Sequence, residues 1–231
     1  MNLAIITARG GSKRIPKKNI KNFCGKPIIA YSIEAAIKSG IFDEIMVSTD
    51  SEEIAEISKQ YGAHVPFLRS NKTSNDYATT SEVLLEVLDE YIKRGYCCEY
   101  ACCIYPTAPF VTGERIKQGM EIVVNENVDT VMPVVAFSFP PQRGVVVKDG
   151  ILLPLYPEHM SKRSQDLTKV YHDCGQFYCF KVDSFFKHKS LVCPNTRPIF
   201  MDELEVQDID NETDWKLAEL KFKFLKEMKA K

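Results

Sequence analysis

The sequence lacks an excess of charge of either sign, a long apolar run and the start of a secretion signal. Its 30 lysines and arginines against 31 aspartates and glutamates leave a formal net charge of −1, so the chain has no global field with which to coat nucleic acid or an anionic membrane. No apolar run approaches the ~18 residues of a membrane-spanning helix. Positive charge is also missing from the first six residues, where a signal peptide would carry it. We therefore expect a cytoplasmic protein with no nucleic-acid partner and no membrane partner.

Cysteine is present, but without the spacing of a metal site. The eight cysteines form no C-x-x-C pair, and no histidine lies at zinc-finger spacing from them. Cys97-Cys98 and Cys102-Cys103 flank the start of an apolar segment, where cysteine behaves as a small hydrophobic residue. We expect reduced structural thiols rather than a zinc site.

Apolar segments of strand length alternate with helical patterns along most of the chain. This alternation predicts one α/β domain over residues 1–231, with a doubly wound, mostly parallel sheet of the Rossmann-like kind. Strands are predicted at 2–8, 44–50, 100–106, 128–135, 175–182 and 204–210. Helices are predicted from Pro27 to about Lys38, after Asp50 (with Glu53 completing a capping box), after Thr79, after Thr112 and from about Thr213.

The alternation breaks at about 136–170, a segment that contains Pro140, Pro141, Pro154 and Pro157. Proline removes a backbone donor and fixes φ, so this segment does not fit a further strand–helix unit. We expect a hairpin and an extended arm, inserted late into the domain.

Two glycines and five cations follow the first predicted strand within twelve residues, "ARGGSKRIPKKN" (8–19). A loop at this position lies at the carboxyl edge of the sheet, where such folds bind ligands. Neither the Walker A pattern nor the dinucleotide glycine pattern fits the stretch. The residues alone leave two interpretations open: a polyphosphate site, in which Gly10 and Gly11 bring backbone amides to phosphate oxygens, or a solvated basic loop.

Asp208 and Asp210 form a D-x-D pair, with Asp214 four residues further on. Alternate residues of a strand share one face, so the two carboxylates could converge on one hard cation. The alternative is an acidic strand end with Asp214 in the first turn of the following helix. The residues alone do not decide between the two.

The loop resembles that of a known family, the acidic-sugar cytidylyltransferases, which make CMP-activated acid sugars from CTP. Agreement extends over almost the whole chain, through "ITARGGSKRIPKKN" (6–19), "GKPIIAYSIEAA" (25–36), "VSTDSEEIAEISKQYGA" (47–63), "YPTAPF" (105–110) and "VQDIDNETDW" (206–215). The resemblance implies a nucleotide-diphospho-sugar transferase sheet with an inserted dimerisation arm, and a homodimer with shared sites. It also implies that the anomeric hydroxyl of the sugar attacks the α-phosphorus of CTP.

The resemblance assigns residues to the nucleotide and to a metal. Lys18, Asp208 and Asp210 are implied to be catalytic, with the two aspartates holding Mg²⁺. Lys13, Arg14 and Lys17 stay open between phosphate contacts and surface charge, and Arg69 and Thr79 between phosphate contacts and an ordinary loop arginine and helix cap. The implied nucleotide contacts are Arg9, Gly10, Gly11, Ser12, Lys18, Asn19, Arg69, Asp76, Thr79, Thr80, Pro106 and Thr107.

The implied sugar is a nonulosonic acid, whose carboxylate requires a cation. The segments "TSNDYATT" (73–80) and "VYHDCGQFYCF" (170–180) resemble the branch that acts on pseudaminic acid, and Tyr105 stands where the family usually has glutamine. Transfer to neuraminic acid or another eight- or nine-carbon acid is the alternative within this chemistry, and a non-catalytic nucleotide-sensing domain is the alternative outside it. The implied sugar contacts are Tyr105, Arg143, Arg163, His172 and Gln176.

Overall fold

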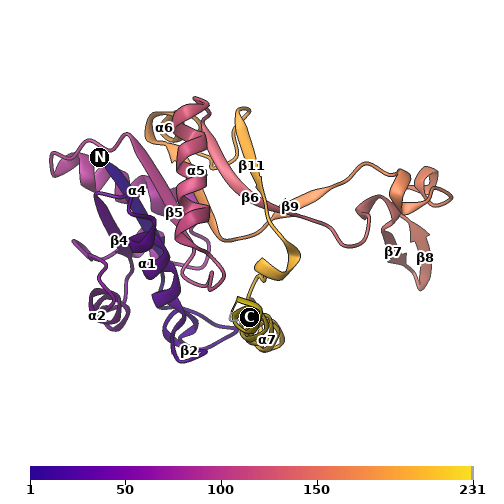
Figure 1. The fold of residues 1–231 in the computed structure, drawn as a ribbon, viewed down its shortest axis with the longest axis horizontal. Coiled ribbons are helices and arrows are strands. Elements are labelled where there is room, and N and C mark those ends of the chain that lie inside the picture. The colour runs from indigo at the N-terminus through magenta and orange to yellow at the C-terminus, as the bar shows by residue number, and fades with distance from the viewer. Residues whose placement is uncertain (230–231) are drawn as a thin grey trace.

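A computed structural model describes residues 1–229, and at its centre lies a seven-stranded sheet in the order β11-β6-β10-β5-β1-β4, with β9 paired to β6 (Figure 1). Five of the seven strands run in one direction, whereas β10 and β9 run antiparallel to their neighbours. β10 lies in the middle of the sheet and is buried on both faces, so its apolar run has the same pattern as that of a parallel strand. The strands are β1 (Asn2–Thr7), β4 (Glu44–Ser48), β5 (Tyr100–Ile104), β6 (Thr130–Ala136), β9 (Tyr171–Asp173), β10 (Phe177–Lys181) and β11 (Thr196–Phe200).

Helices cover both faces of this sheet, which confirms the predicted doubly wound architecture. Side chains of β1 alternate between two buried clusters: Ala4 and Ile6 pack with α1, α2 and α5, whereas Leu3 and Ile5 pack with α4 and α6. The contact between α1 and α5 is close at Gly113, where a Cβ atom would lie 2.8 Å from a backbone nitrogen of α1. The helices are α1 (Ile28–Ser39), α2 (Glu52–Gln60), α3 (Asn71–Ser74), α4 (Thr80–Lys93), α5 (Gly113–Asn125), α6 (Val182–His188) and α7 (Glu212–Lys229).

A third cluster holds α7 beneath the carboxyl edge of the sheet. Trp215 and Phe222 of α7 pack edge-to-face on Phe23, with ring centroids 5.5 and 5.4 Å apart. Edge-to-face pairs contribute about 0.5–1.5 kcal/mol each beyond the area they bury. This cluster therefore ties the C-terminal helix to a small hairpin, β2 (Asn22–Phe23) and β3 (Lys26–Pro27), which follows the cation-rich stretch 8–19.

Residues 137–170 leave the body of the molecule as an arm (Figure 1). Its tip is the hairpin of β7 (Val145–Lys148) and β8 (Ile151–Pro154), joined by Asp149 and Gly150, both at positive φ. Two such residues form the turn that matches the twist of a tight hairpin. The arm also contains the 3₁₀ turns η2 (Pro141–Arg143), η3 (Pro157–His159) and η4 (Ser164–Asp166).

Two predicted details are wrong. The segment 204–210 is not a strand: it starts in the 3₁₀ turn η5 (Glu203–Glu205) and continues without pairing, while β11 takes the sheet position beside β6. The N-cap of α2 is Ser51, whose hydroxyl accepts the Ile54 amide, and not Asp50.

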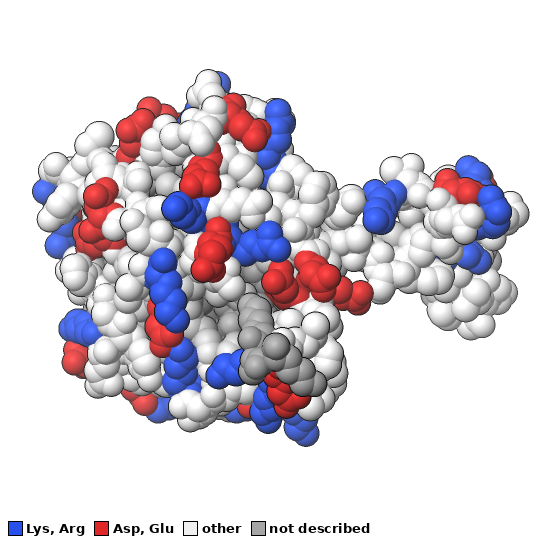
Figure 2. Space-filling model, in the orientation of Figure 1, with Lys and Arg blue, Asp and Glu red and all other residues white. Residues whose placement is uncertain are grey.

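The charges of the molecule are interspersed on the face shown in Figure 2, in keeping with the near-zero net charge. None of the helices within residues 1–229 is both long enough and apolar enough to cross a membrane.

Candidate active site

A cavity of about 460 Å³ lies at the carboxyl edge of the sheet, bounded on one side by the cationic loop (residues 8–18) that joins β1 to the 3₁₀ turn η1 (Lys18–Ile20). Segments far apart in the sequence meet there: the loop, the chain before α4, the turn after β5 and the segment before α7. Ten of the predicted residues line it: Arg9, Ser12, Lys18, Asn19, Arg69, Thr80, Tyr105, Pro106, Thr107 and Asp210.

The backbone of the loop is held by neighbouring side chains, and Gly10 lets it approach Ser51, where a Cβ on Gly10 would lie 3.2 Å from the Ser51 Cβ. The side-chain amide of Asn19 donates to the carbonyl of Arg9 at 2.8 Å. The amide of Gly10 donates to Oδ1 of Asp50 at 2.7 Å, so this N–H is already committed, and a Cβ on Gly11 would meet nothing within 4 Å. Neither glycine lines the cavity, in contrast to the prediction that their amides face phosphate.

Two carboxylates hold the cations of the loop. Asp76 accepts from Arg9 Nη1 at 2.6 Å and pairs with Lys13, and the hydrogen bonds from Lys13 and Arg9 lower the pKa of Asp76. Asp210 Oδ1 lies 2.9 Å from Arg14 Nη2 and 3.9 Å from Lys18 Nζ. A triphosphate must compete with these two carboxylates for the same cations.

Lys13 and Arg14 line the cavity, whereas Lys17 does not. Lys17 Nζ instead binds both oxygens of Glu53, at 2.7 and 2.8 Å. The structure thus separates the three cations that the sequence left open, and places Lys17 with the surface charges.

Lys18 reaches into the cavity and donates from Nζ to the carbonyl of Ile209 at 2.7 Å. Burial lowers the pKa of Lys18, although the charges of Asp210 and Asp208 act in the opposite direction. An ammonium group has three donors, so two remain for oxygens of a ligand. Lys18 therefore links the loop to the segment that carries the two aspartates.

Arg69 is buried, with 8% of its surface exposed, and its guanidinium is anchored on β4. Nε donates to the hydroxyl of Ser48 at 3.0 Å and Nη2 to the Ser48 carbonyl at 2.6 Å. Burial lowers the pKa of Arg69 to about 10, so the side chain is still charged at neutral pH. Within the part of the chain that the structure describes, Nη1 has no hydrogen-bond partner, which leaves it available to a ligand.

The two threonines at the N-terminus of α4 have different roles. Thr79 forms a capping box with Glu82, which is the ordinary structural role, and does not line the cavity. Thr80 does line it, and its hydroxyl lies 3.1 Å from the hydroxyl of Tyr105.

A polar wall continues from Tyr105 to the start of β10. The Tyr105 ring packs against Tyr178 with centroids 5.6 Å apart, and Tyr178 donates its hydroxyl hydrogen to Asp173 Oδ2. Asp173 Oδ1 accepts the amide of Gly175, whose φ of +61° closes the turn. Burial raises the pKa of both Tyr105 and Tyr178, so both are neutral donors. Tyr178 was missed from the sequence, although it lies two residues beyond Gln176 in the same motif.

Asp208 and Asp210 lie on an unpaired segment, yet they alternate as strand residues do. Ile209 between them is 1% exposed and belongs to the third cluster. Partial burial and the negative charge of Asp210 raise the pKa of Asp208. Asn211 caps α7, because its Oδ1 accepts the amides of Thr213 and Asp214 at 2.8 and 3.0 Å. Asp214 Oδ2 in turn accepts the amides of Asp210 and Asn211 at 2.9 and 3.0 Å, which ties it to the backbone of this segment.

The donor set fits Mg²⁺ only if a ligand supplies further oxygens. Among residues 1–229, no group of three or more His, Cys, Asp or Glu is placed to hold a metal by itself. Mg²⁺ is usually bound by one or two carboxylates together with substrate phosphates and water. Asp208 and Asp210, beside a cationic cavity, fit this second kind of site.

Four predicted sugar contacts lie outside the cavity. Gln176 is 3% exposed and donates from Nε2 to the carbonyl of Glu205 at 2.7 Å. His172 packs its ring on Phe137, 4.7 Å between centroids, and points to the opposite face of β9 from Asp173. Arg143 and Arg163 lie on the arm, where they bind Ser164 and Asp166.

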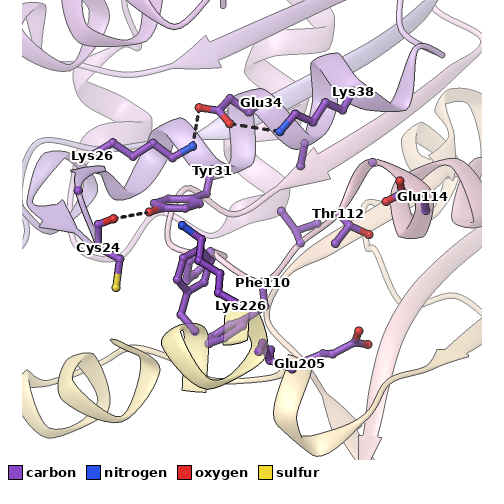
Figure 3. Close-up of a pocket in the computed structure, with 17 residues that line it drawn as sticks. Cys24, Lys26, Tyr31, Glu34, Lys38, Phe110, Thr112, Glu114, Glu205 and Lys226 are labelled. Atoms are coloured by element: carbon purple, nitrogen blue, oxygen red, sulfur yellow. Dashed lines mark hydrogen bonds and ion pairs between the residues drawn. The ribbon is translucent and has the colours of Figure 1, made fainter. Parts of the chain in front are cut away.

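A second cavity, of about 650 Å³, lies between α1, the 109–114 loop and α7 (Figure 3). Figure 3 shows Glu34 between Lys26 and Lys38, with Tyr31 and Phe110 beside Lys226. It is larger than the first cavity, but none of the predicted site residues lines it. The smaller cavity is therefore the candidate active site, and the turn that follows β5 separates the two.

The chain is similar to known proteins over nearly its whole length. Residues 3–183 match the family model described as cytidylyltransferase. The chain is 38% identical over 223 residues to a pseudaminic acid cytidylyltransferase of Campylobacter jejuni subsp. jejuni serotype O:2, covering 96% of each chain. It is 32% identical over 222 residues to a CMP-N,N'-diacetyllegionaminic acid synthase of Legionella pneumophila subsp. pneumophila, covering 94% of each. A solved CMP:2-keto-3-deoxy-manno-octonic acid synthetase in complex with CTP has the same fold, with a TM-score of 0.70, 17% identity and coverage of 98% of this chain and 99% of that one.

Proposed function

The chain belongs to the cytidylyltransferase family, and we propose that it transfers CMP from CTP to the anomeric hydroxyl of pseudaminic acid, with release of pyrophosphate. One observation carries this proposal: Arg9 and Lys18 of the cationic loop and Arg69, which lies some fifty residues further on, converge on one cavity beside Asp210. A triphosphate is the ligand that needs three cations at one point. The similarity to a pseudaminic acid enzyme over 96% of both chains supports the choice of sugar.

The cavity residues would act by positioning and charge neutralisation, on which phosphoryl transfer mainly depends. Arg69 is anchored on Ser48 and presents Nη1. Lys18 keeps two donors for phosphate oxygens, and Arg9 exchanges Asp76 for phosphate when the nucleotide binds. Fixed cations of this kind stabilise the charge that develops on the leaving pyrophosphate without reorganising during the reaction.

Asp208 and Asp210 are proposed to hold the metal, with Mg²⁺ as the cofactor. Mg²⁺ bound there would neutralise the triphosphate and polarise the α-phosphate. The chain's own contribution is to place the two carboxylates next to the cationic loop, through Arg14 and Lys18 on Asp210. This carboxylate pair favours an enzyme over a nucleotide-sensing domain, since a sensor needs no metal pair beside the phosphates.

The sugar is proposed to lie between Tyr105 and Asp208. Asp208 Oδ1 lies 3.9 Å from the point that a Cβ on Gly175 would occupy, so the Asp173–Gly175 turn borders this space. Thr80 and Tyr105 line its other side, and Tyr178 packs behind the Tyr105 ring. The sugar carboxylate still requires a cation, and the arm carries two candidates, Arg143 and Arg163.

We propose that the arm brings these arginines to the site of a second copy of the chain. Its hairpin exposes apolar side chains, with Val147 at 72%, Leu152 at 63% and Phe139 near its base at 60% exposure, and within residues 1–229 nothing covers them. An apolar hairpin that projects from the body is suited to pack on a partner.

Light scattering is expected to give a particle of twice the 26.3 kDa chain mass. The double variant Val147→Asp/Leu152→Asp is expected to give monomers of low activity, while the body keeps its circular dichroism. A monomeric wild-type chain with full activity would contradict this proposal.

The cytoplasmic location expected from the sequence stays a prediction.

The function is tested by pyrophosphate release with each nucleoside triphosphate and with pseudaminic acid. We expect release with CTP and sugar together and little with ATP, GTP or UTP. Arg9→Ala removes a charge-assisted phosphate contact worth about 1.5–3 kcal/mol, which corresponds to about a 10- to 100-fold loss in kcat/KM for CTP.

Lys17→Ala is the matched control, because Lys17 carries the same charge in the same loop but binds Glu53 outside the cavity. We expect it to keep nearly full kcat/KM. Equal losses in the two variants would show that the loop acts only through its net charge. Pyrophosphate release without any acid sugar would refute the proposed reaction.

A further inference from the structure

The segment that carries Asp208 and Asp210 receives much of its support from side chains. Since it is not a strand, no neighbouring strand binds its carbonyls. The Glu205 carbonyl accepts from Gln176 Nε2 at 2.7 Å, and the Ile209 carbonyl accepts from Lys18 Nζ at 2.7 Å. The amide of Asp210 donates to Oδ2 of Asp214 at 2.9 Å. The position of the aspartates thus depends on a few side chains from other parts of the chain.

Lys221 of α7 supplies two more of these contacts. Its Nζ donates to the carbonyl of Val206 at 2.8 Å and to that of Glu203 at 3.2 Å. Glu203 is the first residue of η5 and Val206 is the residue after its last, so one ammonium group bridges the start and the end of this turn. Within the described residues no carboxylate oxygen comes within 4 Å of Nζ, and the ammonium is therefore committed to the backbone.

We propose that Lys221 is a positioning residue for the Asp208–Asp210 pair: it fixes the backbone two residues before Asp208, and through it the approach of both carboxylates to the metal. This inference rests on the proposed function and extends it to a residue outside the cavity. Lys18 and Gln176 hold the same segment, but Lys18 faces the ligand and Gln176 is buried. Asp214 holds it as well, but its own negative charge acts on Asp208. Lys221 is the member of the set that can be changed without touching either the substrate or the core.

The test compares Lys221→Met, Lys221→Arg and Lys223→Met. Methionine keeps the apolar stem and removes the donors, arginine restores donors to both carbonyls, and Lys223 is an exposed lysine on the same helix with no such contact. Mn²⁺ serves as the probe, and electron paramagnetic resonance follows its binding to the protein in the presence of CTP, with Mn²⁺ and CTP alone as the blank, because the two carboxylates need further oxygens from a ligand. Asp210→Asn defines the binding that belongs to this site.

We expect Lys221→Met to weaken Mn²⁺ binding about tenfold and to raise the Mg²⁺ concentration for half-maximal CMP transfer by a similar factor. Lys221→Arg is expected to lie within about threefold of the wild type, and Lys223→Met to be unchanged. Thermal unfolding midpoints within a few degrees of one another would show that metal placement, and not the fold, is affected.

Unchanged Mn²⁺ binding in Lys221→Met would overturn the inference while CMP transfer still supports the proposed function. The same would follow if Lys223→Met lost as much metal affinity as Lys221→Met. If the wild-type chain binds no Mn²⁺ that Asp210→Asn removes, the inference fails together with the proposed metal site, and the pyrophosphate assay decides separately whether the reaction stands.

Discussion

Asp210→Asn is expected to reduce CMP transfer by at least about 100-fold and to leave the fold intact. Asparagine keeps the shape of the side chain but removes the negative charge that Mg²⁺ requires from its ligands. The residue is half-buried beside Arg14 and Lys18, and both cations stay within reach of solvent or of a triphosphate. Raising Mg²⁺ is expected to restore part of the rate, because a weakened site fills at higher concentration.

Asp214→Asn is the matched control on the same segment. Asp214 accepts the amides of Asp210 and Asn211, and the side-chain oxygen of asparagine can accept the same amides, so we expect the backbone at Asp210 to stay in place and the free energy of unfolding to change by less than about 1 kcal/mol. The Mg²⁺ concentration for half-maximal activity is expected to stay close to that of the wild type. Full wild-type activity in EDTA would exclude a metal at the Asp208–Asp210 pair. A higher Mg²⁺ requirement in Asp214→Asn would indicate that the metal also binds Asp214, at the start of α7.

Motif and periodicity together predict the parts of this molecule that depend on local sequence. The cationic loop follows β1 as expected, Thr79 and Thr112 cap their helices, and the apolar stripe of Trp215 and Phe222 faces the core. Each of these features is determined by residues within one or two turns of each other. For that reason the doubly wound architecture can be derived without the structure.

Features that depend on distant partners are not predictable in the same way. Residues 204–210 have the apolar alternation of a strand, and that pattern is the same whether the backbone pairs with another strand or with Lys18, Gln176 and Lys221. Asp50 has the spacing of a helix cap, but Ser51 takes that role, which frees Asp50 for the Gly10 amide. In both cases the competing partners lie outside the local sequence: Lys221 is 15 residues from Val206, and Gly10 is 40 residues from Asp50.

In the candidate site, too, the features set by local sequence are predicted and those set by distant partners are not. Residues on the cationic loop and on the turn after β5 lie in the cavity because each motif is continuous in sequence. Among the implied sugar contacts only Tyr105 reaches it. Gln176 points to Glu205, His172 lies on the outer face of β9, and Arg143 and Arg163 leave with the arm. A sequence motif identifies these segments, but it does not say which side chain of a segment faces the ligand.

Pseudaminic acid is expected to react with CTP at least about 100-fold more efficiently than neuraminic acid. The two sugars share the carboxylate and the anomeric hydroxyl, so the cations of the site serve either one. They differ in ring stereochemistry and in the amide on the side chain, which a site discriminates by leaving buried polar groups unpaired with the wrong sugar. The hydroxyl of Tyr105 is the polar group placed to read this difference, because Tyr105 lines the cavity and its hydroxyl lies 3.1 Å from that of Thr80.

Tyr105→Gln tests where this preference originates. Glutamine is the usual residue of the family at this position, and it cannot keep both the packing on Tyr178 and the contact with Thr80. We expect kcat/KM for pseudaminic acid to fall by about tenfold or more, with little loss for neuraminic acid, so that the gap narrows. The measurement is pyrophosphate release with each sugar at saturating CTP.

His172→Ala is the matched control, because His172 belongs to the same motif but faces away from Asp173. It is expected to leave the ratio between the two sugars unchanged. If the ratio of kcat/KM for pseudaminic acid to that for neuraminic acid fell with His172→Ala and not with Tyr105→Gln, the sugar would have to bind on the other face of β9. Equal rates with both sugars in the wild-type chain would refute the pseudaminic acid assignment itself. The wall formed by Tyr105, Tyr178 and Asp173 would then serve packing rather than selection.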